Sequence, residues 1–434
     1  MQRIQVTRLL LVVGALALVA GACSSDDKAD DETTTTEKTA TTEAAAGADR
    51  GNVDGELKLG SMVPQTGDLN TIAESLQTPI NMALEEINAA GGVLGKPVVL
   101  VEGDDGTSPT VAEATYAKLV NTDKVDAIVG PAPSGVAAKL AEKIGTDKVP
   151  TCSGSTTAAD LEGAGNGYFF RTAPGDDLQG PALAELITSD GAAKVAIVAR
   201  NDDYGKGFSE ALENALTESG AEVTEVVLYN PEGSNFDADV QKAIDSSPDA
   251  VAVLGFNDDG AQIITAMIGK GAGPSDIPIY TADGMQGSSF AETVDPSDLS
   301  KVAGIKGTAP SSNPAGIEHP FAAKFAETGV DTIFSAYYYD CTNLMALAAE
   351  AAGSDAPADI QAQFAKNLEG ENDCQTFAEC KTFLDEDKTI HYRGASSEFA
   401  EWNVMQPATG VYDVWEYTDT GEVSTLEGEQ ISVP

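Results

Sequence analysis

Short runs of apolar residues alternate with longer amphipathic stretches along most of the chain. The short runs are rich in Val, Ile, Leu and Ala, which is typical of strands buried on both faces, and the longer stretches carry apolar residues at helical spacing. In a first series, the expected strands are 57–63, 98–101, 127–129 and 149–151, and the expected helices are 72–88, 109–120 and 136–144. This alternation predicts βαβ units around a parallel sheet.

A second series repeats the architecture without repeating the sequence. Its expected strands are 194–199, 222–228, 250–254 and 279–280, followed by 302–309, and its expected helices are 205–218, 237–246 and 261–269. Three helical stretches then follow at 321–328, 332–352 and 357–368, before strand-like segments at 390–393 and 411–417. The helical stretches add no sheet, so we expect them to pack on the first series.

The pattern therefore predicts an α/β fold of two doubly wound, Rossmann-like lobes. A length of 434 residues suits two hydrophobic cores better than one, because single cores stop growing at roughly 250–300 residues. Lobe one is expected to contain residues 55–172 plus 308–393, and lobe two residues 173–307 plus 394–434. The chain would then cross between the lobes about three times, near Arg171, Thr308 and Arg393.

The N-terminus has the pattern of an export signal over residues 1–22. Arg3 and Arg8 flank the start of an apolar run at 9–20, which is too short to cross a bilayer of about 30 Å. Small residues then precede Cys23, which resembles the lipobox of bacterial lipoproteins and implies a lipid anchor at that Cys. An ordinary secretory signal with an incidental Cys is the alternative.

Residues 23–54 are rich in Asp, Glu, Thr and Ala and contain no aromatic residue. Such a segment buries too little apolar surface to offset its chain entropy, so we expect a disordered tether. The whole chain carries 69 acidic and 25 basic residues, a formal charge of −44. Repulsion by other polyanions argues against nucleic acid and against membrane contact other than through the lipid anchor.

Four Cys remain once Cys23 is assigned to the lipid, and disulfides persist in exported domains. Cys374 and Cys380 close a short loop and are expected to pair. Cys152 and Cys341 both fall in segments assigned to lobe one, where a second bridge and two free buried thiols are both compatible with the sequence. The spacing of Cys374 and Cys380 does not fit a zinc site, and adjacent Asp pairs such as Asp104-Asp105 and Asp202-Asp203 lack the alternating spacing of a calcium loop. Neither a metal nor a cofactor is therefore expected.

Several motifs, in this order and spacing, resemble the leucine/isoleucine/valine-binding family of type I periplasmic binding proteins. They are Gly91–Gly95, Ile128–Gly130, Phe170–Pro174 with Leu178–Gly180, Asp203–Gly207 and Tyr392–Ser396. The resemblance covers about residues 55–418. It implies a monomeric binding lipoprotein at the outer face of the cytoplasmic membrane. Such a protein delivers a small molecule to an ABC permease and its ATPase subunits.

Hydroxyl side chains follow two strands of lobe one, where helix N-termini present free N–H groups and a positive partial charge. Ser134 follows strand 127–129, and Ser155, Thr156 and Thr157 follow strand 149–151. The plain alternative is that they only cap helices. In the family, the residues that match Ser134, Ser155 and Thr156 hold the carboxylate of an amino acid. One extra residue before Leu161 leaves Thr156 and Thr157 as alternatives.

Lobe two is expected to bind the other end of the ligand. By the resemblance, Asp283 pairs with the ammonium group of the ligand and Phe256 covers the ligand. A turn role for Asp283 and a core role for Phe256 are the alternatives. Tyr204 and Leu69 are weaker candidates for the same cleft. Together these residues imply capture by closure of the two lobes on a branched-chain or similar amino acid.

Other functions receive less support from the sequence. The chain contains neither a Gly-x-Ser-x-Gly elbow nor a P-loop, and His319 and His391 are expected to be structural, so we do not expect an enzyme. The main alternative is a receptor that senses amides, urea or another small polar solute. A secreted enzyme is a more remote alternative.

Overall fold

A computed structural model of the chain describes residues 53–403, 405–426 and 428–434. Within these residues, no helix combines the length and the apolar character needed to cross a membrane. The expected export signal, Cys23 and nearly all of the expected tether lie outside the described residues.

The first sheet is parallel and has the strand order β2-β1-β3-β4-β5. Its strands are β1 (Lys58–Val63), β2 (Val99–Asp104), β3 (Ala127–Val129), β4 (Thr151–Ser153) and β5 (Phe169–Arg171). The helices between them are α1 (Ala73–Ala89), α2 (Pro109–Lys118) and α3 (Ser134–Asp147). We call this sheet and the helices packed on it lobe one.

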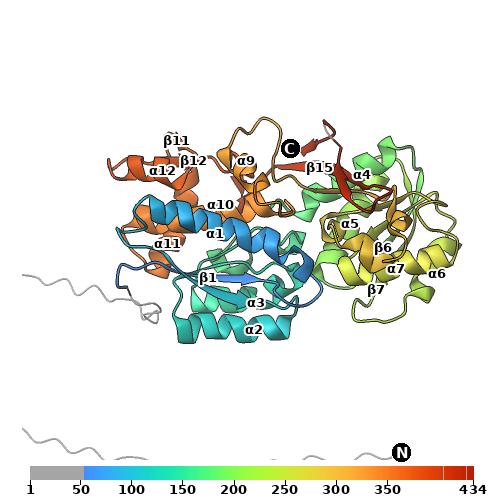
Figure 1. Ribbon diagram of the computed structural model, residues 1–434, viewed down its shortest axis with the longest axis horizontal. Helices are drawn as coiled ribbons and strands as arrows, with labels where there is room; N and C mark the ends of the chain where they lie inside the picture. Colours follow the sequence, from blue (N-terminus) through green and yellow to red (C-terminus); the bar gives the residue numbers. More distant parts are fainter. Residues whose placement is uncertain (1–52, 404, 427) are drawn as a thin grey trace, which may run out of the picture. The chain divides into compact units, whose positions relative to one another are not determined.

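Both faces of the first sheet are covered by helices. Side chains alternate between the faces along each strand, so Leu59 and Val63 join one apolar cluster with α1 while Met62 joins another with α2 and α3. In Figure 1, α1 and α10 (Ser335–Ala352) lie on one side of β1, and α2 and α3 lie on the other. Burial on both faces explains why these strands read as continuous apolar runs.

The second sheet has the order β16-β15-β10-β9-β8-β6-β7, with β17 paired to β15. Its strands are β6 (Lys194–Arg200), β7 (Glu222–Tyr229), β8 (Ala250–Leu254), β9 (Ile279–Thr281), β10 (Lys306–Pro310), β15 (Gly410–Tyr417), β16 (Val423–Thr425) and β17 (Ile431–Val433). Its helices are α4 (Asp176–Ser189), α5 (Asp203–Glu218), α6 (Asp237–Asp245), α7 (Asn257–Gly269) and α8 (Phe290–Val294). Strands β6 to β10 pair in parallel and β15 runs antiparallel to β10. We call this sheet and its helices lobe two.

The helical block after β10 packs on lobe one, as its lack of strand pattern indicates. It contains α9 (Pro320–Ala326), α10, α11 (Pro357–Phe364) and α12 (Phe377–Leu384), and α10 contacts α1, β3 and β4. Two small strand pairs complete this part of the chain: β11 (Asn372–Cys374) with β12 (Ile390–Tyr392), and β13 (Trp402–Asn403) with β14 (Gln406–Pro407).

Some elements differ from the sequence-based expectation. The fourth strand begins at Thr151 rather than at residue 149, and β10 begins at Lys306 rather than at 302, because residues 299–302 form a 3-10 turn. Helix α4 was not expected at all, since Gly180 and Pro181 inside it are poor helix formers.

The chain passes between the sheets after β5, after β10 and before β15. The sequence places the third passage near Arg393, but the segment after it still contacts lobe one. The carboxylate of Asp340 on α10 accepts hydrogen bonds from the backbone N–H groups of Ala395 and Ser396, and the N–H of Arg171 donates to the carbonyl of Met405. The chain therefore reaches the second sheet only at Gly410.

Two disulfides tie elements of lobe one together. Cys374 and Cys380 join β11 to α12, as the spacing predicts. Cys152 on β4 is bonded to Cys341 on α10, so of the two alternatives that the sequence leaves open, the second bridge is the one present.

Candidate ligand-binding site

Loops at the carboxyl ends of strands in both sheets surround a small cavity between the lobes. In lobe one they follow β1, β3 and β4, and in lobe two they follow β6, β8 and β9. Seven of its lining residues are candidates from the sequence: Leu69, Ser134, Ser155, Thr157, Tyr204, Phe256 and Asp283. Ligands of open α/β sheets bind at this edge, so the cavity is the candidate site.

The cavity has a volume of about 20 Å³. A site needs about 10–15 Å³ to admit one water molecule, so this volume holds little more than that. The lobes are therefore closed on each other in this structure. A larger ligand can enter only when the lobes separate or when side chains of the wall withdraw.

The hydroxyl of Ser134 links two of the lobe-one loops. Its Oγ accepts hydrogen bonds from the backbone N–H groups of Thr157 at 3.1 Å and Ala158 at 3.2 Å. Because the oxygen acts as acceptor in both bonds, the hydroxyl hydrogen can still be donated to an anionic group in the cavity.

Ser155 is held more firmly by the protein itself. Its Oγ donates to the carbonyl of Ala132 at 3.1 Å and lies 2.9 Å from the hydroxyl of Tyr338. The Tyr338 side chain comes from α10, one turn before Cys341. The hydroxyl of Ser155 thus fastens the loop after β4 to α10 as well as facing the cavity.

The structure separates the two neighbouring threonines. Thr157 lines the cavity, whereas Thr156 is not among the lining residues. The N–H of Thr156 donates to Oγ of Ser153, and its carbonyl accepts a bond from the guanidinium of Arg171 at 3.3 Å. Of the two alternatives, Thr157 is the one that lines the cavity.

Asp283 supplies the only charged side chain among the lining residues. It lies directly after β9, where its Oδ1 accepts a hydrogen bond from Nε2 of Gln179 at 2.9 Å and another from the hydroxyl of Tyr204 at 3.4 Å. Burial raises the pKa of Asp283 to about 7, although both hydrogen bonds act in the opposite direction. A carboxyl group on lobe two, ionised above about pH 7, thus shares the cavity with hydroxyl-bearing residues of lobe one.

A second carboxyl group lies close to Asp283 and was not identified from the sequence. Burial raises the pKa of Asp176 well above its ordinary value, and the nearby Asp283 raises it further. Asp176 is the first residue of α4, and Gln179 lies three residues later on the same helical face. Their spacing would have been informative only if α4 had been recognised as a helix.

The remaining lining residues are apolar or lack a side chain: Ile72, Ala132, Pro133, Gly284 and Phe334. Pro133 and Gly284 adjoin residues that the sequence does indicate, and Ala132 and Ile72 lie within three positions of one. Phe334 does not, because it reaches the cavity from the start of α10, where its φ of 56° lies in the left-handed region. No local pattern in the sequence indicates that Phe334 lines the cavity.

The loop after β4 passes α10 without room for a larger residue. A Cβ atom on Gly154 would lie 2.6 Å from Cδ2 of Tyr338 and 2.9 Å from the backbone carbon of Tyr337. We therefore expect Gly154→Ala to lower the free energy of unfolding by about 1–3 kcal/mol, as overpacking typically does. Gly207→Ala is the control, because its nearest atom is 3.7 Å away. Equal thermal stability of the two variants would contradict the expectation.

Two buried carboxyl groups, Asp283 in the cavity wall and Asp105 behind Ala132, cause the protein to take up protons on folding. Burial raises the pKa of Asp105, which binds the N–H of Ala132, to about 7, and it raises that of Asp283 to about 7 as well. Unfolded Asp loses its proton near pH 3.8, so the folded state binds more protons between that pH and about 7. Stability is therefore greatest at the acid end of this window and is lost as pH rises, by up to about 1.4 kcal/mol per unit for each group.

We accordingly expect the melting temperature to fall as pH rises from about 5 to about 7. Replacing Asp105 with Asn should reduce this slope, because Asn does not titrate. Differential scanning calorimetry of both proteins across the window measures the effect. A melting temperature that rises with pH, or an unchanged slope in Asp105→Asn, would show that burial does not control these groups.

Comparison with known proteins identifies a family and individual relatives that are similar to this chain. A family model described as "Periplasmic binding protein" matches residues 56–391. The chemotactic signal transduction system substrate-binding protein BasB of Halobacterium salinarum is 27% identical over 375 residues, which cover 84% of this chain and 87% of BasB. Leu/Ile/Val-binding protein homolog 1 of Brucella melitensis is 26% identical over 319 residues, 73% of this chain and 84% of that protein.

Among solved structures, the branched-chain amino acid transporter substrate binding protein LivJ from Streptococcus pneumoniae, in complex with isoleucine, has the same fold. The TM-score is 0.67 at 24% identity, and the match covers 86% of this chain and 100% of LivJ.

Proposed function

Because this chain belongs to the periplasmic binding protein family, we propose that it captures an α-amino acid with a small apolar side chain for an ABC importer. Members of the family bind solutes outside the cytoplasm for ABC-type transport and are not enzymes. The finer assignment, to an amino acid and to uptake, is the proposal.

One observation carries it: the buried carboxylate of Asp283 shares a small cavity with the hydroxyls of Ser134 and Thr157. The first can pair with an ammonium group and the others with a carboxylate, and charge-assisted hydrogen bonds are among the stronger polar contacts. Leu69 and Phe256 are among the apolar side chains that complete the wall, so the ligand side chain meets no further charge. An amino acid with an aliphatic side chain satisfies all three requirements.

Capture would proceed by closure of the lobes. An open cleft admits the amino acid, whose two charged ends then bridge the lobes, while the passages after β5, after β10 and before β15 absorb the movement. A solute without the ammonium group leaves the buried charge of Asp283 uncompensated, and one without the carboxylate leaves the hydroxyl hydrogen of Ser134 without an acceptor. A polar contact left unmade in this way costs about 1–3 kcal/mol. Selectivity for α-amino acids thus follows from the need to satisfy both lobes at once.

We further propose that the protein acts as a monomer held at the outer face of the cytoplasmic membrane by a lipid on Cys23. Delivery to the permease and its ATPase subunits would then take place at the membrane surface. The support is the lipobox-like sequence alone, because Cys23 lies outside the described residues.

Native mass spectrometry of the purified protein and a thermal-shift panel of amino acids, amides and urea test the proposed ligand. Bound ligand stabilises the folded state by RT ln(1 + [L]/Kd), so we expect leucine, isoleucine or valine to raise the melting temperature. Stabilisation by amides or urea but by none of the amino acids would overturn the assignment.

The name of BasB gives reason to keep sensing as a second candidate, since that relative belongs to a chemotactic signal transduction system. Uptake of a labelled amino acid in a deletion strain separates the two. Loss of uptake supports the importer, whereas normal uptake with a lost behavioural response supports the sensor.

A further inference from the structure

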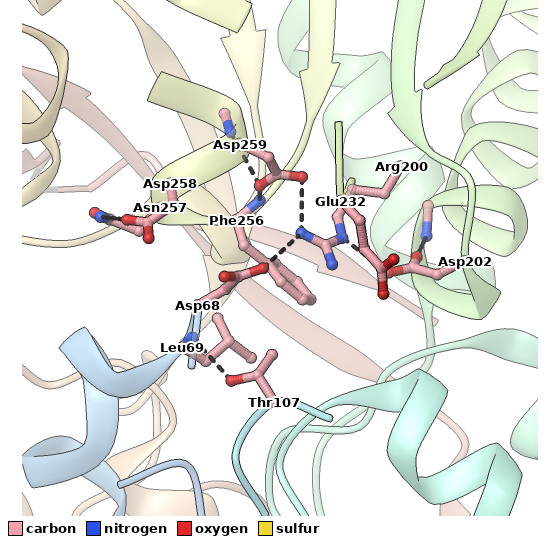
Figure 2. A network of polar contacts seen from close by, with 12 residues as sticks. Asp68, Leu69, Thr107, Arg200, Asp202, Glu232, Phe256, Asn257, Asp258 and Asp259 are labelled. Atoms are coloured by element: carbon pink, nitrogen blue, oxygen red, sulfur yellow. Dashed lines mark hydrogen bonds and ion pairs between the residues drawn. The ribbon is translucent and has the colours of Figure 1, made fainter. Parts of the chain in front are cut away.

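Arg200 is a buried cation at the edge of the ligand cavity. It is the last residue of β6 and is only 6% exposed. Within lobe two its Nη1 lies 2.7 Å from Oδ2 of Asp259, and its Nε lies 2.8 Å from Oδ2 of Asp202 (Figure 2). These two carboxylates already compensate the charge of the guanidinium.

A third carboxylate reaches Arg200 from the opposite lobe. Oδ2 of Asp68, in the loop after β1, lies 3.7 Å from the same Nη1. The next residue, Leu69, lines the cavity, and its N–H donates to Oγ1 of Thr107 at 3.0 Å. The ion pair between Asp68 and Arg200 therefore joins the lobes beside a residue of the cavity wall.

The same guanidinium also orients the aromatic wall of lobe two. Its central carbon lies 3.8 Å from the centroid of the Phe256 ring, a favourable cation–π distance. Asp259, which binds Arg200, also accepts a hydrogen bond from the N–H of Phe256 at 2.8 Å. Figure 2 shows Phe256 between the guanidinium and the loop that carries Leu69.

The ion pair between Asp68 and Arg200 can break without leaving a buried charge unpaired. When the lobes separate, Arg200 keeps Asp259 and Asp202 and is never left unpaired, so opening does not strand a buried charge. Asp68 is 40% exposed in its side chain and can return to water. The contact across the lobes thus adds to the closed state without preventing the open one.

We propose that Arg200 is a positioning residue whose ion pair with Asp68 latches the closed lobes and fixes Phe256 against the ligand. Its role in ligand retention rests on the proposed function; its role in closure does not. Arg200 is not among the residues that line the cavity, so it acts through Phe256 and through the loop of Leu69.

Hydrogen exchange of the full-length, ligand-free protein tests the closure role. Asp68→Asn removes the charge from lobe one, and the readout is exchange in peptides around Phe256 on lobe two. Leu69 belongs to the same apolar cluster as Phe256, so the dependence on salt separates loss of the charge from a local change in the Asp68 loop. We expect exchange there to be up to about fivefold faster, the upper end of the range for a partly exposed ion pair. Glu74→Gln is the control, since it removes the same charge from the exposed start of α1.

Salt supplies a second readout. At about 1 M salt the Debye length falls to about 3 Å, so exchange around Phe256 should accelerate in the wild type but change little in Asp68→Asn. If Asp68→Asn behaves like Glu74→Gln in both measurements, the latch is refuted. In Arg200→Gln, adding Asp68→Asn should have no further effect; should Arg200→Gln unfold, Asp68→Asn alone still decides.

L-isoleucine is the probe for retention. We expect its dissociation rate in Asp68→Asn to rise by up to about fivefold in stopped-flow measurements, with the association rate unchanged because the ion pair forms only on closing. An unchanged dissociation rate would overturn the role in retention. If the wild type does not bind isoleucine, the proposed ligand is wrong, while the exchange data still decide whether the latch exists.

Discussion

Replacing Asp283 with Asn is expected to weaken binding of an amino acid such as L-isoleucine by about 30-fold or more. Removing one member of a buried, hydrogen-bonded charge pair costs about 2–5 kcal/mol, and each 1.4 kcal/mol is a factor of ten. No other lining residue can take over, because Asp283 alone among them is charged. Asn has nearly the same shape and keeps an acceptor for the amide of Gln179, so the loss reports on charge rather than on packing.

Isothermal titration calorimetry above pH 7, where the carboxyl is ionised, measures the change. Asp258→Asn is the matched control: it makes the same substitution on the first turn of α7, where the side chain is exposed. Equal affinities of the two variants would mean that Asp283 does not receive the ammonium group. The other members of the cavity wall would then have to explain recognition without a charge.

Most of the fold could be predicted because the strands are buried on both faces. Residues 127–129 and 250–254 are uninterrupted apolar runs, and the structure has β3 and β8 at these bounds. The pattern fails where local preference and tertiary packing disagree. Helix α4 contains Gly180 and Pro181, yet it forms because its apolar residues Leu183 and Ile187 join the core of lobe two.

The candidate site was predictable to the extent that topology positions it. Parallel sheets bring the carboxyl ends of their strands to one edge, so residues just after strands, such as Ser134, Phe256 and Asp283, gather there whatever lies between them. The order of the motifs then singles out these residues among many loop positions.

Contacts between segments that are far apart in the sequence could not be predicted in this way. Phe334 enters the cavity from the N-terminus of α10, and Arg200 meets Asp68 only because two lobes close on each other. Both contacts depend on how separately built parts fit together. Neither spacing nor composition of a single segment encodes that fit.

The two disulfides should differ widely in what they contribute to stability. In the chain-entropy model, a disulfide stabilises the folded state by reducing the conformational entropy of the unfolded chain. The gain in stability grows with the number of residues in the loop that the bond closes. Cys152–Cys341 spans 189 residues and Cys374–Cys380 spans 6. We expect the double variant Cys152→Ala/Cys341→Ala to lose about 5 kcal/mol of unfolding free energy and Cys374→Ala/Cys380→Ala about 2 kcal/mol.

Urea denaturation followed by circular dichroism compares the two double variants, and each serves as the control for the other. The long bridge should also matter for binding, because Cys152 precedes Ser153, whose Oγ accepts the N–H groups of Ser155 and Thr156. Losing it leaves the hydrogen bond between Ser155 and Tyr338 to hold the loop after β4 on α10, so amino-acid affinity should fall in this variant and stay unchanged in the other. Equal losses of stability, with affinity intact in both, would show that the Cys152–Cys341 bond constrains neither the unfolded chain nor the site.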